Sequence, residues 1–198
     1  MSVDRESHGI PADQHTDKRH SMMAALSRGR ILDIGFADLP NVHLSNHTIG
    51  LDLKRTSKPP NYREVVVNHA NQICFASAAF DTVIAGEVIE HLEEPVRFLR
   101  NCRRVLTLGG CLILSTPNPY YPPIILLNWL LIRRFFFSAD HLYEIAPRHM
   151  ARLLENTGYR SVRMISGGIP LPLGKDRNLH IPSPRAVCYH IVYVAEAA

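Results

Sequence analysis

The residues from Phe80 to Asn118, FDTVIAGEVIEHLEEPVRFLRNCRRVLTLGGCLILSTPN, decide the fold of this chain. The apolar runs at 83–84 and 112–114 are short and bounded by polar or small residues, which is typical of strands buried on both faces. Four residues between the runs recur at helical spacing: Val96, Leu99, Cys102 and Leu106. We expect Gly109 and Gly110 to end that helix. The order of strand, helix and strand predicts a parallel βαβ unit.

The same residues resemble a known family. FDTVIAGEVIEHL followed by RRVLTLGGCLILSTPN is similar to the fourth and fifth strands of class I methyltransferases that use S-adenosylmethionine, in the group of small bacterial methyltransferase domains. The resemblance runs in order from about Arg30 to the C-terminus. It implies an α/β fold with a doubly wound, mostly parallel seven-stranded sheet of the Rossmann-like kind, in the order 3-2-1-4-5-7-6. It also implies a methyl-donor site at the carboxyl ends of the first strands.

The length and composition indicate one domain. A chain of 198 residues suits a single core. We expect a flexible segment at 1–20, a methyltransferase domain at 21–198, and within it an apolar lid or interface insertion at 119–145. The C-terminal part predicts strands at 159–165 and 188–195, and the Pro- and Gly-rich connection between them predicts a loop near the rim of the site.

Charge and cysteine content bear on partners and compartment. The net charge of +4 comes from scattered basic residues, so a solvated surface is favoured over nucleic-acid binding. The four cysteines form no CxxC pair and mostly fall in apolar segments, which suits buried thiols in a reducing cytoplasm. The polar N-terminus has no apolar signal core, so neither secretion nor a membrane anchor is indicated there.

Two short strands introduce the expected cofactor half. RILDI at 30–34 ends at Gly35, and TIGLD at 48–52 ends at Asp52. A small residue at the first turn lets the backbone approach a ligand, and an acid after the next strand can accept both hydrogen bonds of a ribose diol. Methyltransferases of this kind usually have G-x-G-x-G at the first turn, and here Ala37 and Leu39 replace the second and third glycines. The loop at 37–47 is short and contains a proline, so we expect its helix to be abbreviated or irregular.

The resemblance assigns further residues to the donor. Asp33 is expected near the donor's ammonium group or hydrogen-bonded to loop amides, and His69 stands where the family has an acid beside the adenine. The missing G-x-G-x-x-G disfavours a nicotinamide cofactor more than it disfavours S-adenosylmethionine. The complete set of predicted cofactor-binding residues is Asp33, Gly35, Ala37, Asp52, Leu53, His69, Ala70 and Gly86.

The segment after the fourth strand predicts the reacting half. If this turn is helical, Glu87, Glu90 and His91 share one face. Three interpretations stay open: an imidazole or acid that accepts a proton, a divalent-ion site completed by the distant His141, or polar residues that only cap the helix. A divalent metal is therefore left open but is not expected. The predicted catalytic residues are His91, Glu87, Glu90 and His141.

The insertion should decide the acceptor. Its residues 124–137 are unusually apolar, yet these fourteen residues are too few for a bilayer span, which needs about twenty. A lid over a hydrophobic acceptor, a membrane-surface helix, and a homodimer surface or domain core remain open. We predict a cytoplasmic enzyme that transfers a methyl group from S-adenosylmethionine to a small or lipid-like acceptor, by O-methylation. The alternative is a degenerate module that binds the cofactor or serves as a scaffold without catalysis.

Overall fold

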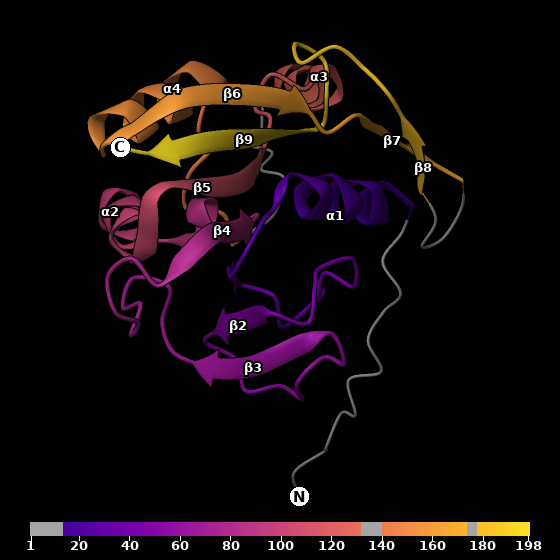
Figure 1. Ribbon diagram of the computed structural model, residues 1–198. Coiled ribbons are helices and arrows are strands. Elements are labelled where there is room, and N and C mark those ends of the chain that lie inside the picture. Colours follow the sequence, from indigo (N-terminus) through magenta and orange to yellow (C-terminus); the bar gives the residue numbers. More distant parts are fainter. Residues whose placement is uncertain (1–13, 132–139, 174–177) are drawn as a thin grey trace, which may run out of the picture.

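A seven-stranded sheet forms the centre of the protein in the computed structural model, which describes residues 14–131, 140–173 and 178–198 (Figure 1). The strand order is β3-β2-β1-β4-β5-β9-β6, with parallel pairing from β3 to β5 and antiparallel pairing of β9 with β5 and β6. The strands are β1 (Ile31–Ile34), β2 (Thr48–Asp52), β3 (Tyr62–Val67), β4 (Phe80–Gly86), β5 (Leu106–Pro117), β6 (Tyr159–Ser166) and β9 (His190–Ala197). This arrangement confirms the predicted fold class and strand order.

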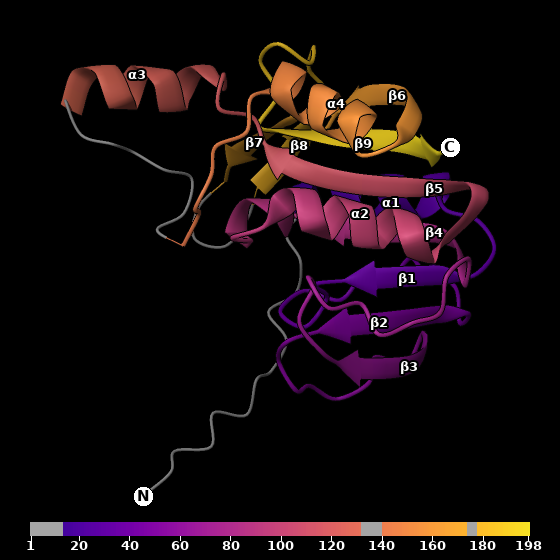
Figure 2. The same cartoon turned by 90° about the vertical axis from the view of Figure 1, so that its left-hand side faces the viewer.

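Helices cover both faces of the sheet (Figures 1 and 2). On one face lie α2 (Pro95–Val105) and α4 (Pro147–Asn156), and on the other lies α1 (Gln14–Leu26). Successive residues of a strand point to opposite faces, so Val83 and Ala85 pack with α2 whereas Ile84 packs in the core with Met23 of α1. The near-continuous apolar runs read from the sequence therefore reflect burial on two sides.

The βαβ unit is confirmed, but its helix ends earlier than expected. The last residue of α2 is Val105, and the chain is already extended at Leu106. Leu106 is buried and pairs with Phe80 of β4, so strand pairing ends the helix before the glycines are reached. Gly109 and Gly110 lie within β5, and the prediction that they stop the helix is wrong.

The connection between β6 and β9 is a hairpin rather than a loop. It contains β7 (Ile169–Pro172) and β8 (Asn178–Ile181), which pair antiparallel as a separate two-stranded sheet. The hairpin lies against the N-terminal end of α1 (Figure 1). The prolines at 170 and 172 obscured these short strands in the sequence, because proline is uncommon in strand interiors.

The expected flexible N-terminus is wrong for residues 14–20, which form the first turns of α1. Residues 1–13 lie outside the described part of the chain. His15, Arg19 and His20 are buried together with Met23. The polar composition concealed this helix, because three of its inward-facing residues are ionisable rather than apolar.

The apolar insertion forms a helix, α3 (Pro122–Leu131), that extends away from the body (Figure 2). The helix is held near its start by Ile124, which is buried. Its exposed apolar side chains are Ile125, Leu126, Trp129 and Leu130. Residues 132–139 lie outside the described part of the chain. No helix within the described residues has both the length and the apolar character required to cross a bilayer.

Candidate functional site

A cavity of about 360 Å³ opens at the carboxyl ends of β1 and β4. Gly35 lines it directly after β1, and its amide donates to the carbonyl of Leu51 at 2.9 Å. The backbone φ of Gly35 is +79°, and a Cβ at this position would lie 2.5 Å from Cγ2 of Val88. A side chain is therefore excluded both by the backbone conformation and by the close approach of Val88.

The residues predicted to hold the ribose are organised around Asp52. Its carboxylate accepts hydrogen bonds from the amide of Ala37 at 2.9 Å and from the amide of Lys54 at 2.8 Å. These two bonds join the turn after β1 to the end of β2. The Leu53 side chain between them is 65% exposed, so it is available to cover a flat ligand. The alanine that replaces the second glycine thus contributes its backbone to the site.

Asp33 lines the cavity with a partner that the sequence did not indicate. Its Oδ2 accepts a hydrogen bond from the Tyr62 hydroxyl, and that hydroxyl accepts one from the amide of Asn41 at 3.2 Å. Burial raises the pKa of Asp33 to about 7, although the bond from Tyr62 acts in the opposite direction. The observed donor to this carboxyl group is thus the Tyr62 hydroxyl rather than a loop amide, and a place beside the donor's ammonium group stays a prediction.

His69 borders a second cavity, of about 340 Å³. The Nδ1 of His69 accepts a hydrogen bond from the amide of Asn71 at 3.1 Å, so one of its two ring nitrogens is already bonded within its own turn. Ala70 is half-buried beside it and packs against the core. His91 lines both cavities and therefore stands at their junction. The predicted adenine-side and reacting residues thus flank one continuous edge of the sheet.

Arg19 is a site residue that sequence reasoning missed. Its side chain is 8% exposed, lines the larger cavity, and donates to Oγ of Ser115 at 3.0 Å. A Cβ on Gly86 would lie 2.9 Å from Nη1 of Arg19. The missing side chain of Gly86, a predicted cofactor residue, therefore leaves room for the guanidinium. No signal marked Arg19, because it lies in a polar segment that carries no recognisable motif.

Glu87 does not share a face with Glu90 and His91, which corrects the predicted arrangement. Its φ is +56°, and the helical turn that follows, η1 (Ile89–His91), begins only after Val88. The left-handed conformation directs Glu87 toward α1, where its Oε1 is 3.9 Å from Arg19 and 4.0 Å from Nδ1 of His190. The expected convergence of two carboxylates and an imidazole is wrong for Glu87.

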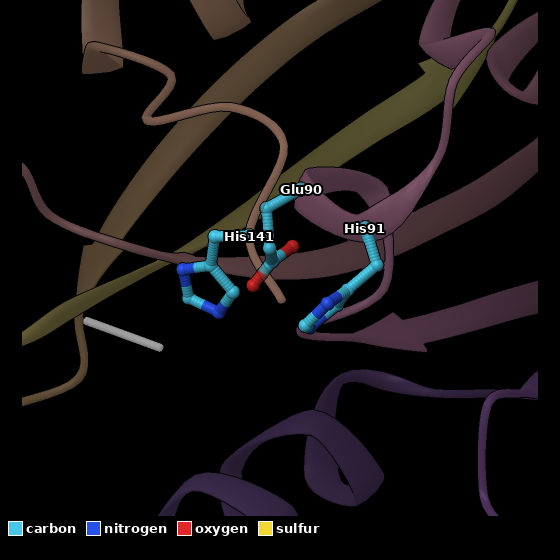
Figure 3. Close-up of side chains that lie close together, drawn as sticks. All are labelled: Glu90, His91 and His141. Carbon is cyan, nitrogen blue, oxygen red and sulfur yellow. The ribbon is translucent and has the colours of Figure 1, made fainter. Parts of the chain in front are cut away.

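Glu90, His91 and His141 converge instead (Figure 3). One ligand atom from each lies within 4.8 Å of the others. The amides of Leu142 and Tyr143 both donate to the carbonyl of Glu90, at 2.9 and 3.2 Å, and so bring His141 back to this turn. The distant His141 is thus brought beside Glu90 and His91, and its role stays a prediction.

The protonation of this cluster follows from burial. Glu90 is 1% exposed, and neither of its carboxyl oxygens has a hydrogen-bond partner within the described part of the chain. Burial, with repulsion from Glu87, raises the pKa of Glu90 to about 8. Burial and the neighbouring His91 lower the pKa of His141. At neutral pH both groups are therefore predominantly uncharged.

His91 has a carboxylate at its back. Its Nδ1 lies 3.2 Å from Oδ2 of Asp140 and 3.2 Å from the carbonyl of the same residue. When Nδ1 carries the proton, these oxygens accept a hydrogen bond from Nδ1–H, and Nε2 is left as the basic nitrogen. Asp140 was not predicted, because it reaches His91 only through the folding of the insertion.

The comparisons with known proteins agree with this architecture. Residues 24–114 match the model of a methyltransferase domain family. A probable S-adenosylmethionine-dependent methyltransferase of Mycolicibacterium smegmatis is 29% identical over 173 residues, which is 80% of this chain and 65% of that protein. A ubiquinone biosynthesis O-methyltransferase of Cereibacter sphaeroides is 29% identical over 148 residues, covering 65% of this chain and 59% of that protein. The chain thus spans less than two thirds of the length of these relatives.

A solved structure extends the likeness to nearly the whole fold. The S-adenosylmethionine-dependent methyltransferase of Archaeoglobus fulgidus superposes with a TM-score of 0.67 at 16% identity, over 92% of each chain. This likeness concerns the fold. In its strand order, in the matched methyltransferase domain and in these relatives, the chain is similar to class I S-adenosylmethionine-dependent methyltransferases.

Proposed function

We propose that this protein transfers a methyl group from S-adenosylmethionine to a hydroxyl group of a small or lipid-like acceptor. The observation that carries the proposal is the cavity of about 360 Å³, which has Asp33, Gly35 and Gly86 on its wall together with His91 and His141. Donor-side and proton-accepting groups thus border the same space. Leu39 also lines this cavity but leaves it open, which favours an enzyme over a degenerate scaffold.

The donor has three parts that the site can distinguish. The adenine is assigned to His69, which lines the second cavity. The ribose hydroxyls are assigned to Asp52, whose carboxylate accepts hydrogen bonds from two amides and which precedes the exposed Leu53. The amino-acid part then extends into the larger cavity, where the buried guanidinium of Arg19 is suited to a carboxylate. Glu87, at 3.9 Å from Arg19, balances part of that charge and is suited to the donor's ammonium group.

Replacing Arg19 should weaken donor binding in a ligand-selective way. We expect Arg19→Gln to lose roughly 1 to 3 kcal/mol of affinity for S-adenosylmethionine, the range for a lost charged hydrogen bond. Affinity for methylthioadenosine, which has no carboxylate, should stay nearly unchanged. Titration calorimetry with both ligands measures the two values.

Lys18→Gln is the matched control for this titration, because it removes an exposed positive charge from the neighbouring position of α1. Equal losses for the two ligands would indicate a general disturbance of α1 rather than carboxylate recognition. Failure of the wild-type protein to bind either ligand at millimolar concentration would favour the scaffold alternative.

Methyl transfer requires alignment and a proton acceptor. The acceptor oxygen attacks the methyl carbon, the carbon–sulfur bond breaks, and the electron pair of that bond stays on sulfur. The hydroxyl proton passes to Nε2 of His91, and Asp140 stabilises the imidazolium that forms. His141, kept neutral by burial, is placed to hold the hydroxyl by a hydrogen bond.

His91 should matter for turnover and not for donor affinity. We expect His91→Ala to lower kcat by roughly 100-fold or more, the usual contribution of a general base, with the dissociation constant of S-adenosylmethionine changed by less than about twofold. Transfer of a radiolabelled methyl group to catechol measures the rate. Asp140→Asn should give an intermediate loss, and His149→Ala, an exposed histidine of α4, is the control. A His91→Ala rate equal to that of the wild type would remove His91 from the mechanism.

The acceptor class is inferred from the insertion and the relatives. The exposed side chains of α3 offer an apolar surface beyond the site, and one relative is named as a ubiquinone biosynthesis O-methyltransferase. An aromatic hydroxyl on an apolar chain combines both features. The same segment, predicted at 124–137 and described here as far as Leu131, is also suited to a membrane surface or a second copy of the chain. The four free cysteines suit the reducing cytoplasm.

A chain-length series tests the acceptor. We expect kcat/KM to rise from catechol to butylcatechol to octylcatechol, because each buried methylene contributes up to about 0.8 kcal/mol. Trp129→Ser, which removes an exposed ring from α3, should reduce the gain for octylcatechol and leave catechol unaffected. Equal rates across the series in the wild type would exclude a lipid-like acceptor.

A divalent ion at Glu90, His91 and His141 is the second candidate, favoured by the grouping of their ligand atoms within 4.8 Å and by the unpartnered oxygens of Glu90. Two imidazoles and a carboxylate suit ions such as Zn²⁺ or Mn²⁺. Such an ion, when bound, would act as a Lewis acid toward the acceptor hydroxyl. The charge of a bound ion would also keep Glu90 ionised. The stability of the protein would then depend on pH in opposite ways with and without the ion.

Without an ion, Glu90 should make the protein less stable as pH rises. The pKa of Glu90 is raised from 4.5 to about 8 by burial, so its contribution is fully present below 4.5 and is lost as pH rises through 8. We expect the free energy of unfolding of the wild type to fall by roughly 3 to 5 kcal/mol, relative to Glu90→Gln, between pH 5 and pH 9. Urea unfolding at several pH values measures this difference.

The metal candidate is tested in the same series. Zn²⁺ or Mn²⁺ should raise the urea midpoint of the wild type at pH 8 and leave Glu90→Gln unchanged, if the ion binds there. Glu155→Gln, an exposed acid of α4, controls for loss of charge. Parallel pH profiles for wild type and Glu90→Gln without added metal would contradict a neutral Glu90.

A further inference from the structure

Three imidazoles from distant parts of the chain meet beside the cavity. His15 of α1 has its Nε2 3.1 Å from Nδ1 of His190 in β9, and its Nδ1 3.3 Å from Nδ1 of His180 in β8. The His15 ring stacks on His180, with centroids 5.4 Å apart, and meets His190 edge-on. We call His15, His180 and His190 the histidine cluster. It joins the N-terminal helix, the hairpin and the main sheet.

One member of the cluster, His15, lies on the helix that lines the cavity. Arg19, His20 and Met23 of α1 line the cavity one to two turns beyond His15. The start of α1 is held to the hairpin by a further bond, from the amide of His180 to Oε1 of Gln14 at 3.3 Å. The position of Arg19 therefore depends on contacts that histidines make at the start of its helix.

The hydrogen-bond pattern limits how many protons the cluster can hold. A neutral imidazole has one donor and one acceptor nitrogen, so His15 can accept from one outer ring only while it donates to the other. If His180 and His190 both become cationic, each presents an N–H at Nδ1, and His15 cannot accept both. Protonation of the outer rings thus replaces a hydrogen bond by repulsion.

The positive groups around the histidine cluster also disfavour protonation of its outer rings. Arg19 and His20 of α1 face His190, and Lys18 faces His180. Glu87 is the opposing charge, with its Oε1 4.0 Å from Nδ1 of His190 and 3.9 Å from Arg19. Burial, with these positive groups, lowers the pKa of His190 well below its usual range and lowers that of His180.

We propose that the histidine cluster is an acid-sensitive latch that positions α1, and with it Arg19, over the cavity. Its catalytic consequence rests on the proposed role of Arg19 in donor binding. When the imidazoles are neutral, the hairpin and β9 hold α1 closed. When the outer rings take up protons, α1 separates from the hairpin and Arg19 leaves the cavity.

The direction and size of the pH effect on the opening of α1 follow from the difference in histidine pKa between the closed and open states. A histidine whose pKa is lowered in the closed state stabilises that state above its open-state pKa, near 6.5, and loses this contribution as pH falls below it. For one histidine, the opening equilibrium rises about tenfold between pH 7.5 and pH 5.5. A second titrating ring makes the change steeper.

Hydrogen exchange of the full chain without donor measures this opening. We expect the protection factors of amides in α1 to fall at least about tenfold from pH 7.5 to pH 5.5, after correction for the chemical exchange rate at each pH. The amides of α2, on the opposite face of the sheet, should keep their protection. Unchanged protection of α1 in the wild type would overturn the latch.

Neutral substitutions separate the latch from general acid unfolding. In His180→Gln combined with His190→Gln, the protection of α1 should change by less than about twofold over the same range, whereas His149→Gln should behave as the wild type. A tenfold loss in the double variant would contradict the proposal. Should the buried His190→Gln prevent folding, His180→Gln on the hairpin decides alone: its pH-dependent loss must be clearly smaller than that of the wild type.

Donor binding then connects the latch to the reaction. The dissociation constant of S-adenosylmethionine should rise more between pH 7.5 and pH 5.5 in the wild type than in the neutral variants, in which the titration of Asp33 on the cavity wall remains. Methylthioadenosine should show no such difference between wild type and variants. Loosening of α1 with the same pH dependence of affinity in the wild type and the variants would show that the latch does not position Arg19. Absence of donor binding at every pH would instead reject the proposed function and leave the exchange result valid.

Discussion

The parallel register of β1, β2, β4 and β5 is the constraint on which the site depends. Ile34 pairs with Leu51, and Gly86 pairs with Ser115, so the four strands end at one edge of the sheet. Every chain segment that leaves this edge carries polar groups into the same space. Apolar burial on both faces, by α1 on one side and by α2 and α4 on the other, keeps this register rigid.

Charge is arranged at this edge in two separate groups. Arg19 and Glu87 form a charged pair near α1, whereas the buried Glu90 groups with the partly buried His91 and His141 a short distance away. The left-handed conformation of Glu87 separates them, because it turns one carboxylate away before the helical turn begins. A charged pair and a carboxyl group whose pKa is raised by burial thus lie at the same edge of the sheet.

The sequence indicated the candidate site residues that lie in or next to motifs. It did not indicate the residues that contact the site from distant parts of the chain. Gly35, Asp52 and the turn after β4 were recognisable because strand ends and short spacings mark them. Arg19, Tyr62 and Asp140 had no such mark. Each acts through a contact with a residue far along the chain, namely Gly86 and Ser115 for Arg19, Asp33 for Tyr62, and His91 for Asp140.

By itself, the sequence determined the parallel βαβ unit, because buried strands, helix periodicity and turn residues are local properties of the chain. The order of the seven strands followed from the resemblance to class I methyltransferases. Only the tertiary structure decided which side chains meet at the site. Arg19 lies on a helix that the polar N-terminal sequence did not indicate, and His180 lies on a hairpin whose prolines obscured its strands. Backbone hydrogen bonds of the insertion bring His141 close to Glu90. These contacts form between segments that are far apart in the sequence; α1 and the hairpin, for example, are separated by more than a hundred residues. No local sequence pattern encodes such contacts.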